Sequence, residues 1–201
     1  MNVELARVYL VRHGETAWML TGLHAGRTDL PLTEEGGRQA RELGSNLTAL
    51  SFDRIFSSPP QRARRTAELA MPHARLEEDN DLMEWDYGAY EGKRTADIEV
   101  ERLGWRVLHD SSPGGETLDA VGARSDRVTG RLCAQGGNVP FFAHRELLRI
   151  LAARWIVLAP VEGRRLQLTT VSLSVLGYDH DLTESVMHVW NARVTAAAGA
   201  Q

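Results

Sequence analysis

The apolar run Val8-Tyr9-Leu10-Val11, which stops abruptly at Arg12-His13-Gly14, constrains this chain more than any other stretch. Four β-favouring residues in succession predict a strand that is buried on both faces. In open α/β sheets, ligands bind in the crevice beyond the carboxyl ends of the strands. Arg12 carries a permanent fork-shaped cation, and His13 offers a nucleophile or proton carrier, so this strand end predicts a site for an anion. The alternative is a strand cap whose side chains only face water.

A second strand of the same design is predicted at 139–143, an apolar segment that ends on His144. A segment with helical periodicity follows at once. A lone histidine after a strand is more often structural, but the chain has only seven histidines. A second one at a strand end therefore favours a site in which His13 and His144 are paired.

Arg62 is the third candidate, because it follows a predicted helix start at Ser58-Pro59-Pro60-Gln61. This segment resembles a capping box with proline at the first helical position. A cation is unfavourable at a helix N-terminus, whereas an anion is welcome there. Arg62 is therefore best explained by a bound anion, while Arg64 and Arg65 are interpreted as a solvated helical face.

Residues 79–92 are rich in carboxylates and aromatic rings without a clean period, which is typical of a loop in a pocket wall. A carboxylate that packs against Trp85 and Tyr87 would be partly desolvated. Desolvation raises the pKa of a carboxyl group, so Glu84 becomes a candidate proton donor near neutral pH. A solvated acidic loop is an equally compatible interpretation.

The rest of the chain predicts alternating helices and strands. Residues 17–32 are too irregular for a helix, and their glycines let backbone N–H groups approach a ligand. Thr33 is the predicted N-cap of a helix that runs to Leu50. The further elements are expected as strands at 52–57 and 74–76, a helix at 95–108 with Ile98, Val100, Leu103 and Trp105 as its apolar contacts, a helix at 116–135, a half-exposed strand at 171–176 and a last strand at 186–190.

Composition limits the class of protein. A chain of 201 residues, 43% hydrophobic and 25% charged, can bury one sizeable core, so residues 1–201 are expected to form one domain. A net charge of -4 excludes a general binder of nucleic acids or anionic membranes.

Cys133 is the only cysteine, which fits a reducing compartment, and no apolar run could span a membrane. A cytoplasmic location is expected. The scattered histidines show no metal-ligand spacing.

Four separated motifs, in this order, resemble those of the histidine phosphatase (phosphoglycerate mutase-like) superfamily. They are Arg12-His13-Gly14-Glu15-Thr16, Ser57-Ser58-Pro59 with Arg62-Ala63 and Thr66-Ala67, Glu84 in Glu-Trp-Asp-Tyr-Gly, and Ala143-His144. Residues 28–33 and 84–92 are similar to the branch that contains fungal sedoheptulose-1,7-bisphosphatase and small bacterial acid phosphatases. Trp105 and Gly115-Glu116-Thr117 agree with that branch.

The resemblance implies an α/β fold, a three-layer α/β/α sandwich with a mostly parallel mixed sheet, and a phosphoryl-enzyme mechanism without metal or cofactor. It implies that His13 attacks phosphorus and that Glu84 first protonates the leaving oxygen and then accepts a proton from water. Arg12, Arg62 and His144 would hold the phosphoryl oxygens.

By position, four further residues match segments that contact substrate or line the pocket: Trp18, Ala25, Gly26 and Tyr87.

Two positions depart from the family pattern. Arg145 stands where the family usually has glycine, and Met19 stands where it has asparagine or serine. Arg145 could strain a glycine-only backbone or fill the phosphate pocket, and we hypothesise that it reduces activity without abolishing the fold. Alternatively, the side chain swings out or adds a phosphate contact. Met19 removes one polar contact, for which a loss of about 1 kcal/mol of binding is expected.

The sequence therefore predicts a metal-independent phosphomonoesterase that acts on a small phosphorylated metabolite, with a sugar phosphate expected, and releases inorganic phosphate. One alternative is a phosphoglycerate-type mutase, although the chain has little room for the lid segments that keep water out. Another is a weakened or non-catalytic binder of phosphorylated ligands, because of Arg145. The last strand could be a free edge or the seam of a homodimer.

Overall fold

The structure, a computed structural model, describes residues 7–47, 50, 52, 54–135 and 138–193, which are organised around one six-stranded sheet. The strands are β1 (Val8–Arg12), β2 (Arg54–Ser57), β3 (Arg75–Glu78), β4 (Val139–Ala143), β5 (Leu173–Tyr178) and β6 (Ser185–Ala192). Their order is β3-β2-β4-β1-β5-β6, in which β1 to β4 run parallel to one another, β5 pairs antiparallel with β1, and β6 pairs antiparallel with β5. The mostly parallel mixed sheet is confirmed, and β6 lies at its edge.

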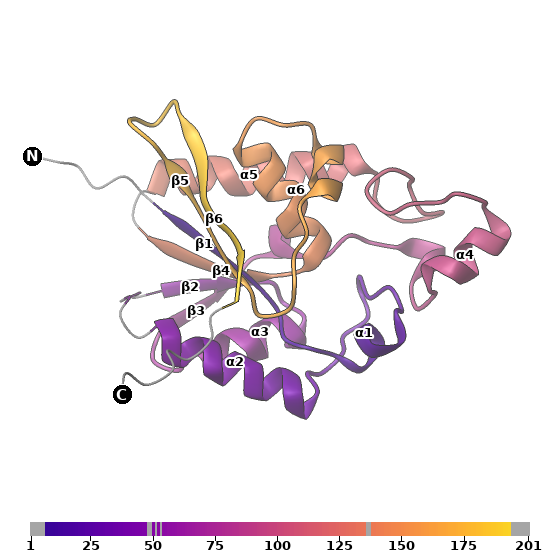
Figure 1. Ribbon diagram of the computed structural model, residues 1–201, viewed down its shortest axis with the longest axis horizontal. Coiled ribbons are helices and arrows are strands. Elements are labelled where there is room, and N and C mark those ends of the chain that lie inside the picture. Colours follow the sequence, from indigo (N-terminus) through magenta and orange to yellow (C-terminus); the bar gives the residue numbers. More distant parts are fainter. Residues whose placement is uncertain (1–6, 48–49, 51, 53, 136–137, 194–201) are drawn as a thin grey trace, which may run out of the picture.

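Helices cover both faces of the sheet (Figure 1). They are α1 (Ala17–Thr21), α2 (Glu34–Leu47), α3 (Gln61–Ala70), α4 (Thr95–Glu101), α5 (Leu118–Gln135) and α6 (Arg145–Trp155), with short 3-10 helices η1 (Asn80–Leu82), η2 (Gly88–Tyr90) and η3 (Pro160–Arg165). The helices α2 and α3 form one outer layer, and α5 and α6 form the other. The predicted three-layer sandwich is confirmed.

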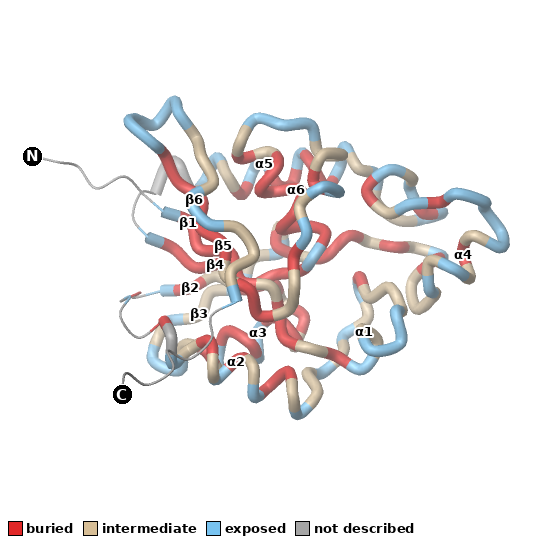
Figure 2. Tube along the Cα trace, viewed as in Figure 1, coloured by how far each residue is buried: buried red, intermediate tan, exposed pale blue. Residues whose placement is uncertain are grey.

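Strand β1 is the centre of the core, because its side chains alternate between the two layers. Val8 and Leu10 pack in the cluster on the side of α5 and α6, while Tyr9 and Val11 pack in the cluster on the side of α2 and α3. All four are buried. Figure 2 shows the same pattern, with buried strands in the middle of the molecule and exposed segments at its rim. A strand between two layers requires this run of apolar residues.

The register of β1 and β4 positions the candidate site. Arg12 pairs with Ala143, so His13 and His144 leave the sheet side by side at the same edge. The His13 N–H donates to the carbonyl of Ala143 at 3.0 Å. Ser58, which follows β2, reaches this edge as well, because its N–H donates to the Phe142 carbonyl at 2.9 Å. Three strand ends therefore converge.

Two helix boundaries differ from the predictions. Residues 17–21, expected as irregular loop, form the single-turn helix α1, which Gly22 ends in the left-handed conformation. The helix predicted for 95–108 ends at Glu101, because Arg102 leaves the helical conformation with φ -139° and ψ 89°, and Gly104 and Leu108 beyond it take positive φ. Consequently Ile98 and Trp105 are buried as expected, whereas Val100 and Leu103 are 88% and 95% exposed.

The start of α3 also differs from the prediction. Pro60 is its N-cap, and Ser58 makes no capping bond, because its hydroxyl lies against His144. The first free N–H of α3, that of Gln61, instead donates to the Asp29 carboxylate at 2.7 Å. At α2 the prediction is confirmed: the Thr33 hydroxyl accepts from Gly36 N–H at 3.0 Å.

Cys133 lies in α5, and its side chain is outside the described residues. Within the described segments, none of the helices has the length and apolar character needed to span a membrane.

Candidate active site

A cavity of about 240 Å³ opens at the carboxyl ends of β1 and β4. Its wall contains five of the predicted site residues: Arg12, His13, Ala25, Glu84 and Tyr87. The two departures from the family pattern, Met19 and Arg145, lie in the same wall. The other four predicted residues do not line it: His144 packs against the His13 ring, Arg62 bonds to His144, and Trp18 and Gly26 lie outside the wall.

His13 is held as a neutral imidazole, and among the described residues its Nε2 has no hydrogen-bond partner. Its Nδ1 lies 2.7 Å from the Gly14 carbonyl, so Nδ1 carries the proton and donates it to that oxygen. Burial, and then the charges of Arg62 and Arg12, lower the pKa of His13 well below 6.5. The lone pair of Nε2 is therefore available at neutral pH, and such a nitrogen can act as a nucleophile.

His144 lies against His13, with ring centroids 5.2 Å apart and planes at 62°. Its Nδ1 accepts from the Nε–H of Arg62 at 3.2 Å, so its proton is assigned to Nε2, which donates to the Ser58 hydroxyl at 2.8 Å. Burial and the charge of Arg62 lower the pKa of His144 well below 6.5. Both nitrogens of His144 are thus engaged by the protein.

Arg62 is fully buried and links the histidine pair to the loop that follows α1. Its guanidinium donates to the carbonyls of Thr28, Gly26 and Ala25 at 2.7, 2.8 and 3.2 Å. These neutral carbonyls satisfy its N–H groups without cancelling its charge, so the positive field of Arg62 remains directed at both histidines.

Arg12 and Thr16 present unpartnered polar atoms. The Nη1 of Arg12 donates to the Leu168 carbonyl at 2.6 Å, but its Nε and the Thr16 hydroxyl are buried without a hydrogen-bond partner in the described part of the chain. Burial, and then the charge of Arg145, lower the pKa of Arg12 to about 10, so it stays a cation at neutral pH. Buried unpartnered donors are rare, and anionic oxygens would satisfy these two. Thr16 was missed as a site residue, although it belongs to the Arg-His-Gly-Glu-Thr motif.

Glu84 is 4% exposed and lies against the first turn of α6. Its carboxylate accepts the N–H groups of Trp85, Glu146 and Leu147 at 2.9 to 3.1 Å. Those bonds favour the charged form, but burial and the neighbouring charge of Glu146 outweigh them and raise the pKa of Glu84 above 4.5. Glu84 therefore keeps its proton to a higher pH than an ordinary glutamate does. Glu146 was also missed as a residue of this wall, because no sequence pattern marks a glutamate that becomes buried beside a second glutamate in the fold.

The loop that carries Glu84 is held from behind by Arg124. The guanidinium of Arg124 donates to the Asp81 carbonyl and to the carboxylate of Glu116, both at 2.9 Å. Tyr87, three residues after Glu84, is buried and stacks on His24 with ring centroids 4.7 Å apart. Both interactions order the cavity wall on the side of Glu84.

Gly26 has a structural role in this arrangement. Its N–H donates to the Glu91 carboxylate at 2.9 Å rather than into the cavity. A Cβ at Gly26 would lie 2.3 Å from the Trp85 carbonyl, so the close approach of these two segments requires glycine. Trp18 packs near Gly92, where an added Cβ would lie 3.1 Å from the indole ring.

Arg145 is the first residue of α6, so its backbone is helical and does not require glycine. Its side chain is 46% exposed, and the cavity remains open beside it. The sulfur of Met19 accepts a hydrogen bond from Nη2 of Arg12 at 3.8 Å. Met19 thus contacts the arginine directly.

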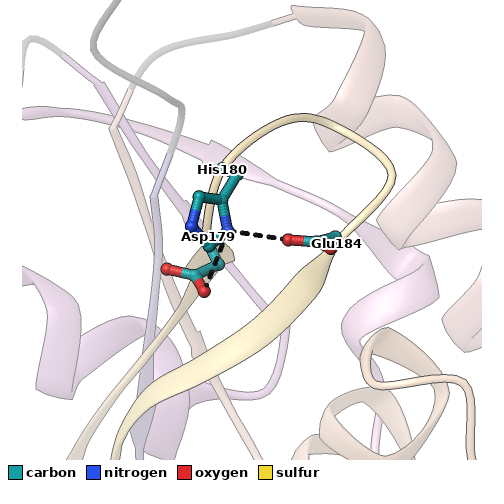
Figure 3. A group of neighbouring side chains, drawn as sticks. All are labelled: Asp179, His180 and Glu184. Carbon is teal, nitrogen blue, oxygen red and sulfur yellow. Dashed lines mark hydrogen bonds and ion pairs between the residues drawn. The ribbon is translucent and has the colours of Figure 1, made fainter.

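One group of side chains could in principle ligate a metal, and it lies elsewhere. Among the described residues, only Asp179, His180 and Glu184 bring three donor atoms within 4.8 Å of one another. All three are exposed on the β5–β6 turn, where His180 pairs with both carboxylates (Figure 3). This turn lies at the opposite end of the molecule from α1 and α4 (Figure 1). We interpret the group as ion pairs of the hairpin.

Comparison with known proteins identifies the family of this chain. The chain belongs to the histidine phosphatase superfamily, branch 1, whose family model matches residues 8–192. It is similar to an acid phosphatase of Mycobacterium tuberculosis, 35% identical over 188 residues that cover 92% of each chain. It is also similar to sedoheptulose 1,7-bisphosphatase of Saccharomyces cerevisiae, 33% identical over 182 residues that cover 74% of this chain and 67% of that protein.

A solved structure of an open reading frame product from Mycobacterium tuberculosis has the same fold, with a TM-score of 0.85 at 33% identity over 94% of this chain and 98% of the other. The family resemblance and the fold class inferred from the motifs are thereby confirmed.

Proposed function

We propose that this chain is a phosphatase that hydrolyses a small phosphorylated metabolite, with a sugar phosphate expected, through a phosphohistidine on His13. One observation carries the proposal: the free Nε2 of a neutral His13 shares a cavity with the protonatable Glu84 and with unpartnered donors of Arg12 and Thr16. The similarity to an acid phosphatase and to a sugar bisphosphatase supports it.

The proposed reaction has two displacements. In the first, Nε2 of His13 forms a bond to phosphorus, the bond to the leaving oxygen breaks, and Glu84 gives its proton to that oxygen. In the second, water attacks phosphorus, Glu84 takes a proton from the water, and the bond to Nε2 breaks to release inorganic phosphate.

Positive charge on the protein stabilises both transition states in this proposal. Arg12 faces the phosphoryl oxygens from the cavity wall, with the Thr16 hydroxyl beside it. Arg62 and His144 act from behind His13, where Arg62 supplies a full positive charge and His144 fixes its position. Two guanidinium groups take the role that a metal ion has in many phosphoryl-transfer sites, so no metal is needed.

Phosphate release from a panel of sugar mono- and bisphosphates, measured in excess chelator, tests the proposal. The parent chain should turn over at least one substrate at a rate that chelator does not change. His13→Ala should lose about 10³-fold or more, because it removes the nucleophile. His73→Ala, at an exposed histidine outside the cavity, is the matched control and should keep the parent rate.

Acid-labile labelling of the parent by a radioactive phosphate ester would identify the intermediate, and His13→Ala should not be labelled. No release above the His13→Ala blank would overturn the proposal in favour of a binder of phosphorylated ligands. Exchange of phosphate between substrate positions faster than its release would instead show a mutase.

A further inference from the structure

The cavity contains a second arginine that the proposed chemistry does not use. Arg145 follows His144 directly and lies in the same wall as Arg12 and His13. Arg12, at the end of β1, is only partly exposed and has its Nε buried, whereas Arg145 has 46% of its side chain exposed. A residue that is both in the wall and half exposed belongs to the mouth of the cavity. The two arginines therefore lie at its inner and outer parts.

The charge of Arg145 is poorly matched by the protein. Its only ion pair among the described residues is with Glu146 at 3.4 Å, and no hydrogen bond of its guanidinium is found there. Glu146 has a better partner, because its other carboxylate oxygen lies 2.6 Å from Nη1 of the buried Arg149. Arg149 alone can balance the charge of Glu146. The N–H groups of Arg145 are consequently available to a ligand.

The imidazole of His24 also lies in the cavity wall, but it neither competes with Arg145 for an anion nor supplies a positive charge in its place. Burial lowers the pKa of His24, so this imidazole is neutral at physiological pH. Its Nε2 lies 3.1 Å from the Thr95 hydroxyl, and both residues line the cavity. Arg145 is thus the cation of the outer wall, and an anion bound there would also relieve its repulsion of Arg12.

We propose that Arg145 is a specificity-determining residue that binds a second anionic group of the substrate, a phosphate or a carboxylate, while the reacting phosphoryl group lies between Arg12 and His13. The proposal rests on the phosphatase function above. It identifies the substrate class as phosphate esters that carry a second negative charge. An arginine suits this role because its planar fork can donate two parallel hydrogen bonds to either kind of oxyanion.

Matched substrate pairs test the role of Arg145. We would measure kcat and KM for 3-phosphoglycerate against glycerol 3-phosphate, which differ by a carboxylate, and for fructose 1,6-bisphosphate against fructose 6-phosphate, which differ by a phosphate. In Arg145→Gln, the ratio of kcat/KM between the members of a pair should fall by about 10- to 100-fold, mainly through KM, because a charge-assisted contact is lost. Which pair responds distinguishes carboxylate from phosphate.

Two variants serve as controls. Arg145→Lys keeps the charge but loses the fork and should recover part of the ratio. Arg75→Gln removes the same charge from an exposed position on β3, outside the cavity, and should leave the ratio at the parent value.

The outcomes separate this inference from the proposed function. Hydrolysis that requires His13, with unchanged ratios in Arg145→Gln, would overturn the inference and leave the phosphatase standing. A rise in kcat for both members of each pair would also overturn it, because Arg145 would then be an obstruction. If the parent shows no turnover, calorimetric Kd values for the same pairs apply the same criterion: an equal preference in parent and Arg145→Gln contradicts a second anion site.

Discussion

At the scale of single residues, the cavity moves two pKa values in opposite directions. Burial lowers the pKa of His13 well below 6.5 and raises that of Glu84 above 4.5. Below its pKa, His13 is protonated and cannot attack; above its pKa, Glu84 has no proton to donate. Both shifts favour the protonation states that the proposed mechanism requires, a neutral His13 together with a protonated Glu84. We expect kcat/KM to decline as pH rises through the pKa of Glu84.

Glu84→Gln tests this assignment. Without a proton donor, kcat/KM for alkyl phosphates should fall by about 10²- to 10⁴-fold. For 4-nitrophenyl phosphate, whose leaving group needs no proton, the loss should be far smaller, and the alkaline decline of the pH profile should vanish. Glu101→Gln, on the exposed side of α4, is the control. Equal losses for both kinds of leaving group would contradict the role of Glu84.

At the scale of elements, the first turn of α2 packs directly on the backbone beside His13. A Cβ at Gly36 would lie 2.4 Å from the Glu15 carbonyl, and a Cβ at Gly14 would lie 2.7 Å from the Gly36 carbonyl. The Gly14 carbonyl is the acceptor that orients His13. The close packing of α2 on the loop after β1 therefore helps to fix the position of the His13 imidazole.

Substitution of neighbouring glycines separates this packing from helix propensity. Gly36→Ala should lower the free energy of unfolding by about 1–3 kcal/mol, because backbone atoms must move apart, and should reduce turnover by displacing Gly14. Gly37→Ala is the control, since its Cβ would meet nothing closer than 3.8 Å. It should raise the free energy by about 0.5–1 kcal/mol. Urea denaturation would measure both, and equal effects would refute the packing argument.

The helices and strands also show which parts of the fold and of the candidate site could be predicted from the sequence. Apolar runs at 8–11 and 139–143 located the two central strands and the two histidines, because burial on both faces leaves a clear signal. The capping of α3 by Asp29 had no local signal, since the two partners lie far apart in the sequence. The end of α4 was missed because Val100 and Leu103 complete an apolar pattern yet face solvent. Glu146 joins the cavity wall only through the tertiary fold, whereas Thr16 lies within the Arg-His-Gly-Glu-Thr motif and could have been included.

At the scale of the whole molecule, the buried histidines link stability to pH. Burial lowers the pKa values of His13 and His144 in the folded state. Below pH 6.5, the unfolded chain therefore binds protons at these two histidines, whereas the folded chain does not until the pH reaches the lower pKa values. The free energy of unfolding should therefore fall on acidification from 6.5 down to the folded pKa values, by about 1.4 kcal/mol per pKa unit and group. Glu84 acts oppositely: its raised pKa favours the folded state at low pH, and that contribution is lost as pH rises through it.

His13→Asn should weaken this dependence, because it removes one of the two groups. Between pH 7.5 and 5, the fall in the urea midpoint should be smaller for His13→Asn than for the parent. His73→Asn changes an exposed histidine and should follow the parent curve. Parallel curves for all three proteins would show that His13 does not contribute to the linkage.

The pairing of β1 with β4 has a consequence for when the proposed activity would appear during folding. These adjacent strands supply His13 and His144, yet most of the chain lies between them in the sequence. Loop-closure entropy opposes such distant contacts, and folds rich in them form slowly. No fragment of the nascent chain that lacks β4 holds both histidines, so we expect the proposed activity to emerge late, with the last large step of assembly. A refolding experiment should find catalysis returning in phase with the global tertiary signal, never ahead of it.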